Sequence, residues 1–519
     1  MNGLSEKVFL SLKMPTDDAP VSDQVRIRMA LQALGYENVT FSLEVLRKLY
    51  PMCRNADFDI TVTIVHRENQ WVVVNAEPGD TSRHHYALAV DYGSTTIVMQ
   101  LVDMNSGAVI GEEKAVNGQV VYGTDILSRI TYSLEDPAHA DNLHRVTVET
   151  LNQLLSLLTD STGIDASACP VMVLSGNTTM IHFLLKLNAW TVFASPYAPV
   201  SSDPGFFWGR ELEMEFGGIV YIVPAASNYI GGDIISGLMT LGIHKHDATN
   251  LFFDIGTNGE LVIGNKDWLM AGAGAAGPAL EGYISRWGMR AGDGAIDSVS
   301  IRGENLHFTT IGSKKPVGIC GSGIIDLLAQ MRRSGWINIA GELNPEASAR
   351  IQLFDGELAV VYATAEESAT GEPLYFSQTD IAQYLDTKAA AYTMVECLLE
   401  AAGVTFDDLD HLYLSGAFPA HSDLESAITI GIFPDLPRQK YQVLRNTSLE
   451  GARSILLDRN LLQEAQAVAE NIYCVQFASF PDFLIRMQAA RFIPHTDMSR
   501  YPSIRNYLNS PKESIAAGG

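Results

Sequence analysis

The sequence predicts an α/β protein made of two related halves and preceded by a small α+β domain. The stretches AVDYGSTT, from residue 89, and FFDIGTNG, from residue 252, each place an acid at the end of an apolar run before a glycine turn. The stretches MVLSGNTT, from residue 172, and LYLSGAFP, from residue 412, each end an apolar run in Ser-Gly. Because the two patterns recur in the same order, they indicate an internal duplication.

A chain of 519 residues predicts two to four domains, which we place at residues 1–85, 86–240 and 241–519. In the first of these, alternating apolar residues predict one strand in KVFLSLKMP and two strands in FDITVTIVHRENQWVVVNAEP. Between them, VSDQVRIRMALQAL and SLEVLRKLY have the apolar spacing of amphipathic helices. The turn residues EPGD then separate the small domain from the rest.

The first half begins with HYALAVDYGSTTIVMQLVDMNSGAVIGEEKAVN, whose turn residues divide it into a meander of three antiparallel strands. Helical spacing follows over residues 122–134 and 144–159, and CPVMVLSGNTTM then predicts a buried strand. The second half repeats this order and continues into a C-terminal extension. TNLFFDIGTNGELVIGNKDWLMAGAG predicts three strands, LDTKAAAYTMVECLLEAAG a long helix, and LDHLYLSGAFPAHSD another buried strand. Two such halves predict a ligand cleft between them.

Composition excludes several classes of protein. The formal net charge of −25 disfavours nucleic acid as a partner, because an acidic surface repels a phosphate backbone. No apolar run reaches the ~20 residues of a membrane span, and the start lacks a secretory signal, so a cytoplasmic location without membrane insertion is expected. The five cysteines are at least 77 positions apart, which favours buried thiols over a zinc or iron–sulfur motif.

Both strand–acid–glycine turns have the residue types of a phosphate site. Glycine lets backbone N–H groups approach an anion, hydroxyls add donors, and an acid holds Mg²⁺. In the first turn these residues are Asp91, Gly93, Ser94, Thr95 and Thr96, and in the second they are Asp254, Gly256, Thr257, Asn258 and Gly259. A plain hairpin explains either turn alone, whereas two in one chain, each opening a three-strand meander, favour a nucleotide site.

This pair of turns resembles the phosphate-1 and phosphate-2 loops of the ATPase superfamily that contains actin, sugar and acetate kinases and heat-shock ATPases. The resemblance implies a duplicated actin-like, ribonuclease H-like core around a nucleotide cleft. Within the superfamily, residues 88–452 are most similar to the ATP-dependent reductive activators of corrinoid proteins, and residues 1–85 to the linker and small domain that precede their core. The stretches that carry the similarity are AVDYGSTT, YGTDILSRI, LSGNTTMIHFLL, FDIGTNGEL, AGPALEG, GMRAGDGAID, ICGSGIIDLLA and LSGAFPAHSDLESAITIGIFPD.

The resemblance implies an ATPase that returns a corrinoid protein from inactive Co(II) to Co(I), with ATP and Mg²⁺ as cofactors. The electron moves to a cobalt of lower reduction potential than its donor, and each ~59 mV of that difference lowers the equilibrium constant of the electron transfer about tenfold. Such activators generally begin with a ferredoxin-like domain that holds a [2Fe–2S] cluster. This sequence has no cysteine before Cys53 and no cluster spacing, so we expect no iron–sulfur cluster here and a separate iron–sulfur electron donor. A second departure is VLRNTSLEGA, residues 443–452, which is poorer in glycine than the family pattern.

The resemblance also implies roles for individual residues. Asp91 and Asp254 would position Mg²⁺ and the attacking water, and the hydroxyl and glycine residues of both turns, with Asn258, would contact the phosphates. Glu260 is a candidate base or outer metal ligand, with an exposed strand residue as the alternative. Asn177 and Thr178 would reach the phosphates, or else cap the following helix.

Three further segments are expected at the nucleoside. Gly277 and Glu281 would lie near the ribose. Ser415, Gly416, Ala417 and Phe418 would approach the adenine. Gly321 and Gly323 would open a helix toward the nucleotide, with tight helix–strand packing as an equal alternative.

Other patterns leave alternatives open. Asp125 and Arg129 are four residues apart, which favours a surface ion pair or a partner contact. Asp233, after two glycines, is interpreted as a helix cap or a cleft acid. A small-molecule kinase and a non-catalytic nucleotide-binding scaffold remain alternative functions. The sequence leaves the oligomeric state open, with a homodimer among the alternatives.

Overall fold

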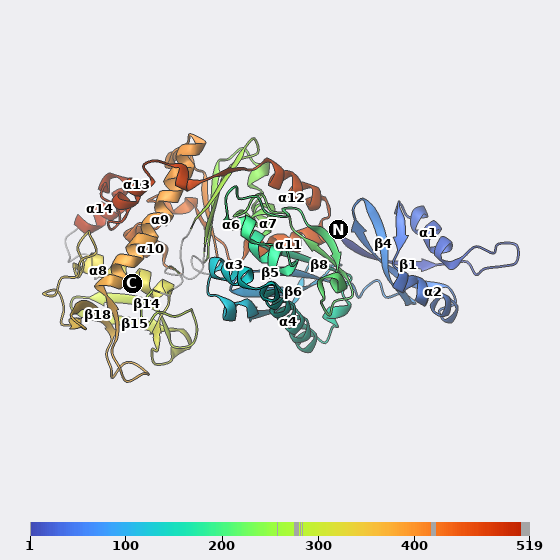
Figure 1. Ribbon diagram of the computed structural model, residues 1–519, viewed down its shortest axis with the longest axis horizontal. Coiled ribbons are helices and arrows are strands. Elements are labelled where there is room, and N and C mark those ends of the chain that lie inside the picture. Colours follow the sequence, from blue (N-terminus) through green and yellow to red (C-terminus); the bar gives the residue numbers. More distant parts are fainter. Residues whose placement is uncertain are drawn as a thin grey trace. The chain divides into compact units, whose positions relative to one another are not determined.

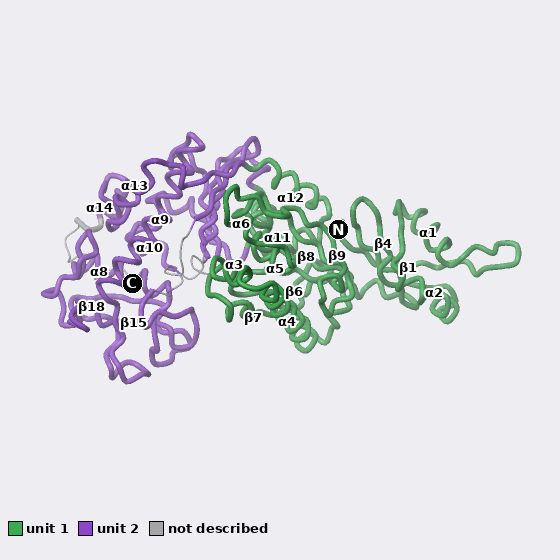
Figure 2. Tube along the Cα trace, in the orientation of Figure 1, with its two compact units in different colours: residues 1–242, 447–472 green, residues 243–446, 473–519 purple. Residues whose placement is uncertain are grey.

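The structure is a computed structural model that describes residues 2–256, 258–274, 280, 282, 284–416 and 422–509. Its internal contacts divide the chain into two compact units, formed by residues 1–242 with 447–472 and by residues 243–446 with 473–519 (Figure 2). The chain therefore returns to the first unit late in the sequence. The three-domain division expected from the sequence is a different partition, and it stays a prediction.

The small N-terminal domain is a four-stranded sheet, in the order β1-β3-β4-β2, with two helices (Figure 1). Its elements are β1 (Ser5–Ser11), α1 (Asp23–Ala33), β2 (Val39–Phe41), α2 (Leu43–Asn55), β3 (Asp59–Arg67) and β4 (Gln70–Pro78). Ser22 and Ser42 cap the two helices by accepting backbone N–H groups of the first turn. Both helices bury side chains against the same alternate residues of β3, so they cover one face of the sheet. The predicted small α+β domain is confirmed.

The rest of the first unit is built on a six-stranded sheet in the order β7-β6-β5-β8-β10-β9. Its strands are β5 (Tyr86–Tyr92), β6 (Thr96–Asp103), β7 (Val109–Val116), β8 (Val171–Gly176), β9 (Gly205–Trp208) and β10 (Ile219–Ile222). Its helices are α3 (Ile126–Glu135), α4 (Pro137–Thr162), α5 (Thr178–Leu184), α6 (Trp190–Phe193), α7 (Gly232–Leu241), α11 (Thr447–Leu457) and α12 (Asn460–Asn471). The meander β5-β6-β7 is antiparallel, as predicted, and β8 pairs with β5 in parallel.

The second unit repeats this sheet. Its order is β21-β20-β11-β12-β13-β22, with β11 (Asn250–Ile255), β12 (Gly259–Gly264), β13 (Leu269–Gly274), β20 (His411–Ser415), β21 (Tyr441–Val443) and β22 (Tyr473–Val475). The register of the parallel strand pairs shows that the two sheets also match residue by residue. Asp91 lies opposite Ser175 in the parallel pair β5–β8, and Asp254 lies opposite Ser415 in the parallel pair β11–β20. Each acid is the penultimate residue of its strand, so the two predicted strand ends have the same construction.

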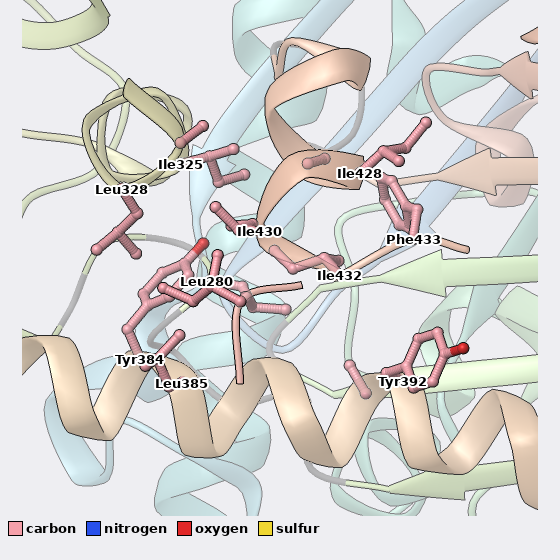
Figure 3. Packing of buried hydrophobic residues seen from close by; sticks show 14 of the residues in the cluster. Leu280, Ile325, Leu328, Tyr384, Leu385, Tyr392, Ile428, Ile430, Ile432 and Phe433 are labelled. Atoms are coloured by element: carbon pink, nitrogen blue, oxygen red, sulfur yellow. The ribbon is translucent and has the colours of Figure 1, made fainter. Parts of the chain in front are cut away.

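Around this sheet the described part of the second unit adds two small sheets and five α-helices. The strands are β14 (Ala295–Arg302), β15 (Asn305–Thr310), β16 (Gly318–Ile319), β17 (Ile351–Phe354), β18 (Glu357–Ala363) and β19 (Leu374–Ser377). The helices are α8 (Gly321–Ser334), α9 (Gln378–Ala402), α10 (Leu424–Ile430), α13 (Phe483–Ala490) and α14 (Pro502–Asn509). Figure 3 shows how α8, α9 and α10 place Leu328, Tyr384 and Ile430 in one buried cluster.

Helix α9 also anchors the C-terminal segment. Lys388 on α9 is fully buried, and its Nζ donates hydrogen bonds at 2.6 Å to the carbonyl oxygens of Phe492 and Pro494 and a third to that of Ala490. Burial lowers the pKa of Lys388. None of the helices in the described ranges is both long and apolar enough to cross a bilayer.

Candidate functional site

In the first unit, three elements meet at the end of β5. The hydroxyl of Ser448, in the first turn of α11, donates a hydrogen bond of 2.8 Å to Oδ1 of Asp91. Oγ of Ser448 also lies 3.0 Å from Oγ of Ser175, which donates a hydrogen bond to the carbonyl of Gly232 at the start of α7. Ser448 and Ser175 are buried. The predicted acid is therefore held by a helix that arrives 357 positions later in the chain.

A second carboxylate stands at the same place. Asp233 lies in the first turn of α7, where its Oδ1 accepts a hydrogen bond of 2.9 Å from the backbone N–H of Ile234. Burial, reinforced by the negative charge of Asp91, raises the pKa of Asp233 to about 7 despite that hydrogen bond. Gly231 makes this approach possible, because a Cβ there would lie 2.5 Å from Cα of Asn177. Of the two interpretations of Asp233, the structure favours the acid beside the site.

The loop after β5 turns its carbonyl groups toward the protein. Asn117 Nδ2 donates to the carbonyl of Gly93 at 2.9 Å, and the backbone N–H of Asn117 donates to that of Thr95 at 2.9 Å. Arg129 Nη1 donates to the carbonyl of Ser94 at 2.6 Å. In a trans peptide the N–H points opposite to the C=O. The N–H groups of residues 94–96 therefore point away from these partners, which is the arrangement an anion requires.

Arg129 behaves differently from both interpretations of its sequence pattern. Its side chain is fully buried, so it is neither a surface ion pair nor a partner contact. Nε donates to the carbonyl of Gly123 at 2.9 Å, while Nη2 has no hydrogen-bond partner among the described residues. Asp125 instead caps α3, accepting the N–H of Ser128. Burial lowers the pKa of Arg129. A buried cation thus lies directly behind the predicted phosphate loop.

Asn177 and Thr178 serve the structure at the start of α5. Asn177 Oδ1 accepts the N–H of Met180 at 2.9 Å, and Thr178 Oγ1 donates to the carbonyl of Ser227 at 2.8 Å. The capping alternative is therefore confirmed for Asn177. A phosphate contact by either residue stays a prediction.

In the second unit, Asp254 on β11 lies opposite Glu260 on β12 in the antiparallel pair. Cross-strand neighbours project from the same face, so both carboxylates lie at one strand end. The connecting turn is closed by a hydrogen bond of 2.9 Å from the N–H of Gly256 to the carbonyl of Asn258. Gly259 is paired with Ile255 in the ladder.

Gly416 completes this strand end. Its φ of +106° and its surroundings both require glycine, because a Cβ would lie 2.2 Å from the carbonyl oxygen of Ile255 and 3.2 Å from Oδ1 of Asp254. Ser415 is buried beside it. The structure therefore brings Asp254, Glu260, Ser415 and Gly416 together. The other predicted residues Thr257, Gly277, Glu281, Ala417 and Phe418 lie outside the described part of the chain.

Of the two predicted glycines of α8, Gly323 has a packing role. A Cβ on Gly323 would lie 2.3 Å from the carbonyl oxygen of Ile296 in β14, so the helix–strand packing alternative is confirmed for Gly323. Gly282 is the last residue of the predicted ribose segment AGPALEG, and a Cβ on it would lie 3.2 Å from the backbone nitrogen of Gly321. The ribose segment therefore ends against the start of α8. A nucleotide contact by Gly321 or Gly323 stays a prediction.

Two units with the same sheet, each ending its first strand in an acid before a glycine turn, have the fold of the actin-like ATPase superfamily. Comparison with known families agrees and narrows the class. Residues 248–505 match the family described as the C-terminal, ASKHA domain of RACo, residues 86–246 the RACo middle region, and residues 1–83 the RACo linker region. The chain belongs to the RACo family.

Relatives extend over most of the chain. The corrinoid activation enzyme RamQ of Eubacterium limosum is 28% identical over 469 residues, which are 86% of this chain and 79% of the relative. The [Co(II) methylated amine-specific corrinoid protein] reductase of Methanosarcina barkeri is 23% identical over 416 residues, which are 75% of this chain and 73% of the relative. A solved reductive activator for corrinoid, iron–sulfur protein has a TM-score of 0.89 and 35% identity, covering 96% of this chain and 81% of its own.

Proposed function

We propose that this protein is an ATP-dependent reductive activator that returns the cobalt of a corrinoid protein from Co(II) to Co(I). One electron leaves a separate iron–sulfur protein and enters the cobalt, and ATP turnover supplies the missing driving force. The observation that carries the proposal is the match to a reductive activator over 96% of this chain at 35% identity. The corrinoid-directed activities named for two further relatives support it.

The residue types at the two strand ends support ATP and Mg²⁺ as the cofactors. This metal is usually bound through one or two carboxylates, water and substrate phosphates, so it needs no dense cluster of protein ligands. Asp91 and Asp254 would supply the carboxylates, and Glu260 lies opposite Asp254 in the β11–β12 pair. The bound metal would neutralise phosphate charge. The N–H groups of residues 94–96 would hold the phosphates, and Asp233 would orient the attacking water and accept its proton.

The chain path suggests how nucleotide state reaches the rest of the molecule. The chain passes between the two units after residues 242, 446 and 472. The first two passages adjoin α7 and α11, the helices that carry Asp233 and Ser448 to Asp91. Occupation of the phosphate loop would therefore bias helices that adjoin these connections, which is a route to hinge closure. Closure would in turn stabilise the complex with the corrinoid partner in its Co(I) state over the complex in its Co(II) state.

The first test is the cobalt spectrum of a corrinoid protein. We expect the Co(II) absorption band to be replaced by the Co(I) band only when this protein, ATP, Mg²⁺ and a low-potential reductant such as Ti(III) citrate are all present. ADP in place of ATP is the control. Normal ATP hydrolysis with no effect of ATP on the cobalt bands would contradict the proposal.

The two alternative functions give different results. A small-molecule kinase would consume ATP in proportion to a phosphorylated product. A scaffold would bind without turnover, or would show no heat with ATP and Mg²⁺ in calorimetry. Comparing the wild-type protein with Asp254→Ala in the same titration tells whether any binding depends on the second strand end.

Arg129 gives a prediction about nucleotide affinity. Arg129→Met removes the donor to the carbonyl of Ser94 and leaves the loop less ordered. A hydrogen bond from a charged donor is worth about 1.5–3 kcal/mol, so we expect the Kd for ATP to rise ~10-fold or more. Fold stability should change little, because an apolar replacement also removes the cost of burying the cation.

The control for this prediction is Arg145→Met, which removes an exposed arginine of α4 that pairs with Glu149. Calorimetry with ATP and Mg²⁺ measures the affinity, and thermal unfolding measures the stability. An unchanged Kd in Arg129→Met would show that the buried cation does not order the phosphate loop.

A further inference from the structure

Helix α2 of the small domain has two apolar faces, and only one of them is used by the fold. Val45, Leu49 and Cys53 are buried in the domain core. Leu43, Leu46 and Tyr50 are 61%, 37% and 69% exposed. Since a helix turns about 100° per residue, the exposed residues and two arginines fall within an arc of about 100°. We call this set the α2 outer face: Leu43, Leu46, Arg47, Tyr50 and Arg54.

The α2 outer face is partly held in place before any partner arrives. The guanidinium of Arg54 lies 4.2 Å from the ring centroid of Tyr50 and pairs with Asp23 of α1 at 2.5 Å. Ordered side chains lose less entropy when a partner binds. Tyrosine and arginine are also the residues that most often dominate protein–protein interfaces. The exposed leucines beside them supply apolar area for the centre of such an interface.

The two helices on this side of the small domain carry a net positive charge, although the chain as a whole is acidic. Helices α1 and α2 carry five basic and two acidic side chains, whereas the chain has a formal net charge of −25. Both acids are already in ion pairs, Asp23 with Arg54 and Glu44 with Lys48. A local basic patch on an acidic protein attracts an acidic partner against the general repulsion. The positive charge of these two helices therefore favours an acidic partner protein.

We propose that the α2 outer face is the docking surface for the electron donor, and that this donor is a small acidic iron–sulfur protein. The inference rests on the proposed function, which needs one electron from outside for each Co(II) reduced. Electron-carrier encounters use small interfaces, and opposite charge accelerates them. The donor's reduced cluster is oxidised by one electron as Co(II) becomes Co(I). Docking keeps the carrier at high effective concentration near a corrinoid protein bound to the same chain.

The test separates docking from catalysis by using two reductants. One is an acidic plant-type [2Fe–2S] ferredoxin kept reduced with NADPH and ferredoxin reductase, and the other is Ti(III) citrate. For the double variant Leu43→Ser/Arg47→Glu we expect ferredoxin-driven, ATP-dependent cobalt reduction to fall at least 10-fold at low salt. The Ti(III) citrate rate should stay the same. In the wild type, added NaCl should slow only the ferredoxin-driven rate.

The control is Arg302→Glu, which reverses one exposed charge at the end of β14, outside the small domain. Equal ferredoxin-driven rates in the double variant and this control would overturn the proposal. So would a wild-type protein that uses Ti(III) citrate but not the acidic carrier, or an α2 variant that changes only the oligomeric state. Failure of Ti(III) citrate with ATP would instead refute the proposed function. In that case the docking surface is still tested by the binding of oxidised ferredoxin. We expect this binding to weaken with added salt in the wild type and to be lost in the double variant.

Discussion

Asp233→Asn is expected to lower ATP turnover by ~10²–10³-fold and, in the same protein, to make the nucleotide-free fold more stable. Positioned acids and bases contribute about 10²–10⁴-fold to proton transfer. Asparagine keeps the size of Asp233 and can still accept the N–H of Ile234, but it cannot take a proton from water. Steady-state ATP hydrolysis measures the loss, with the exposed Asp267→Asn as the control.

The gain in stability follows from the pKa of Asp233, which the fold raises from its usual 3.8 to about 7. The folded protein therefore keeps this proton to a higher pH than the unfolded chain. Stability of the wild type must fall as the pH rises from about 4 to about 7, and the deficit persists above that range. At 1.36 kcal/mol per pKa unit the deficit is up to ~4 kcal/mol, less in proportion to the surface that Asp233 keeps exposed.

Thermal unfolding of the nucleotide-free proteins distinguishes the two effects. We expect Asp233→Asn to melt above the wild type at pH 8 and together with it near pH 3.5. A lower melting temperature at pH 8 would mean that the carboxylate stabilises the fold through a contact stronger than its burial cost. Normal ATP turnover would remove Asp233 from the proposed chemistry, whatever its effect on stability.

Much of the architecture could be predicted because its signals are local. Apolar alternation, glycine turns and serine caps each involve a few neighbouring residues, and they suffice for the small domain and both strand–acid–glycine ends. The two Ser-Gly strands were predictable for the same reason. Their parallel pairing with the strands of Asp91 and Asp254, which the sequence did not predict, places Ser175 and Ser415 opposite the two acids.

The parts that could not be predicted depend on distant segments. The return of residues 447–472 to the first unit has no local signal in the sequence. Ser448 meets Asp91 only through that return. Arg129 shows the same limit, because its spacing from Asp125 is that of a surface pair, and only tertiary packing decides that it is buried.

The return of α11 leads to the second large expected effect, the substitution Gly451→Ala. Alanine in a helix interior normally gains about 1 kcal/mol over glycine. Here a Cβ would lie 2.0 Å from the carbonyl oxygen of Ser236 and 2.7 Å from its Cα, both in the backbone of α7. Overpacking of this kind costs typically 1–3 kcal/mol and more when backbone must move. Set against the gain from alanine, this predicts a net loss of up to ~2 kcal/mol and a lower melting temperature.

The functional effect should follow from the same displacement. Thr240 near the end of α7 donates a hydrogen bond of 3.1 Å to the carbonyl of Thr447, next to Ser448. If alanine pushes α11 away from α7, Ser448 moves with it and Asp91 loses its donor. ATP affinity should then fall together with stability, whereas Glu450→Ala, at the half-buried neighbour in α11 that pairs with Arg453, should change neither by much. A Gly451→Ala protein as stable as the wild type would show that α7 and α11 are not in contact in solution. The position of α11 beside Asp91 would then also be wrong.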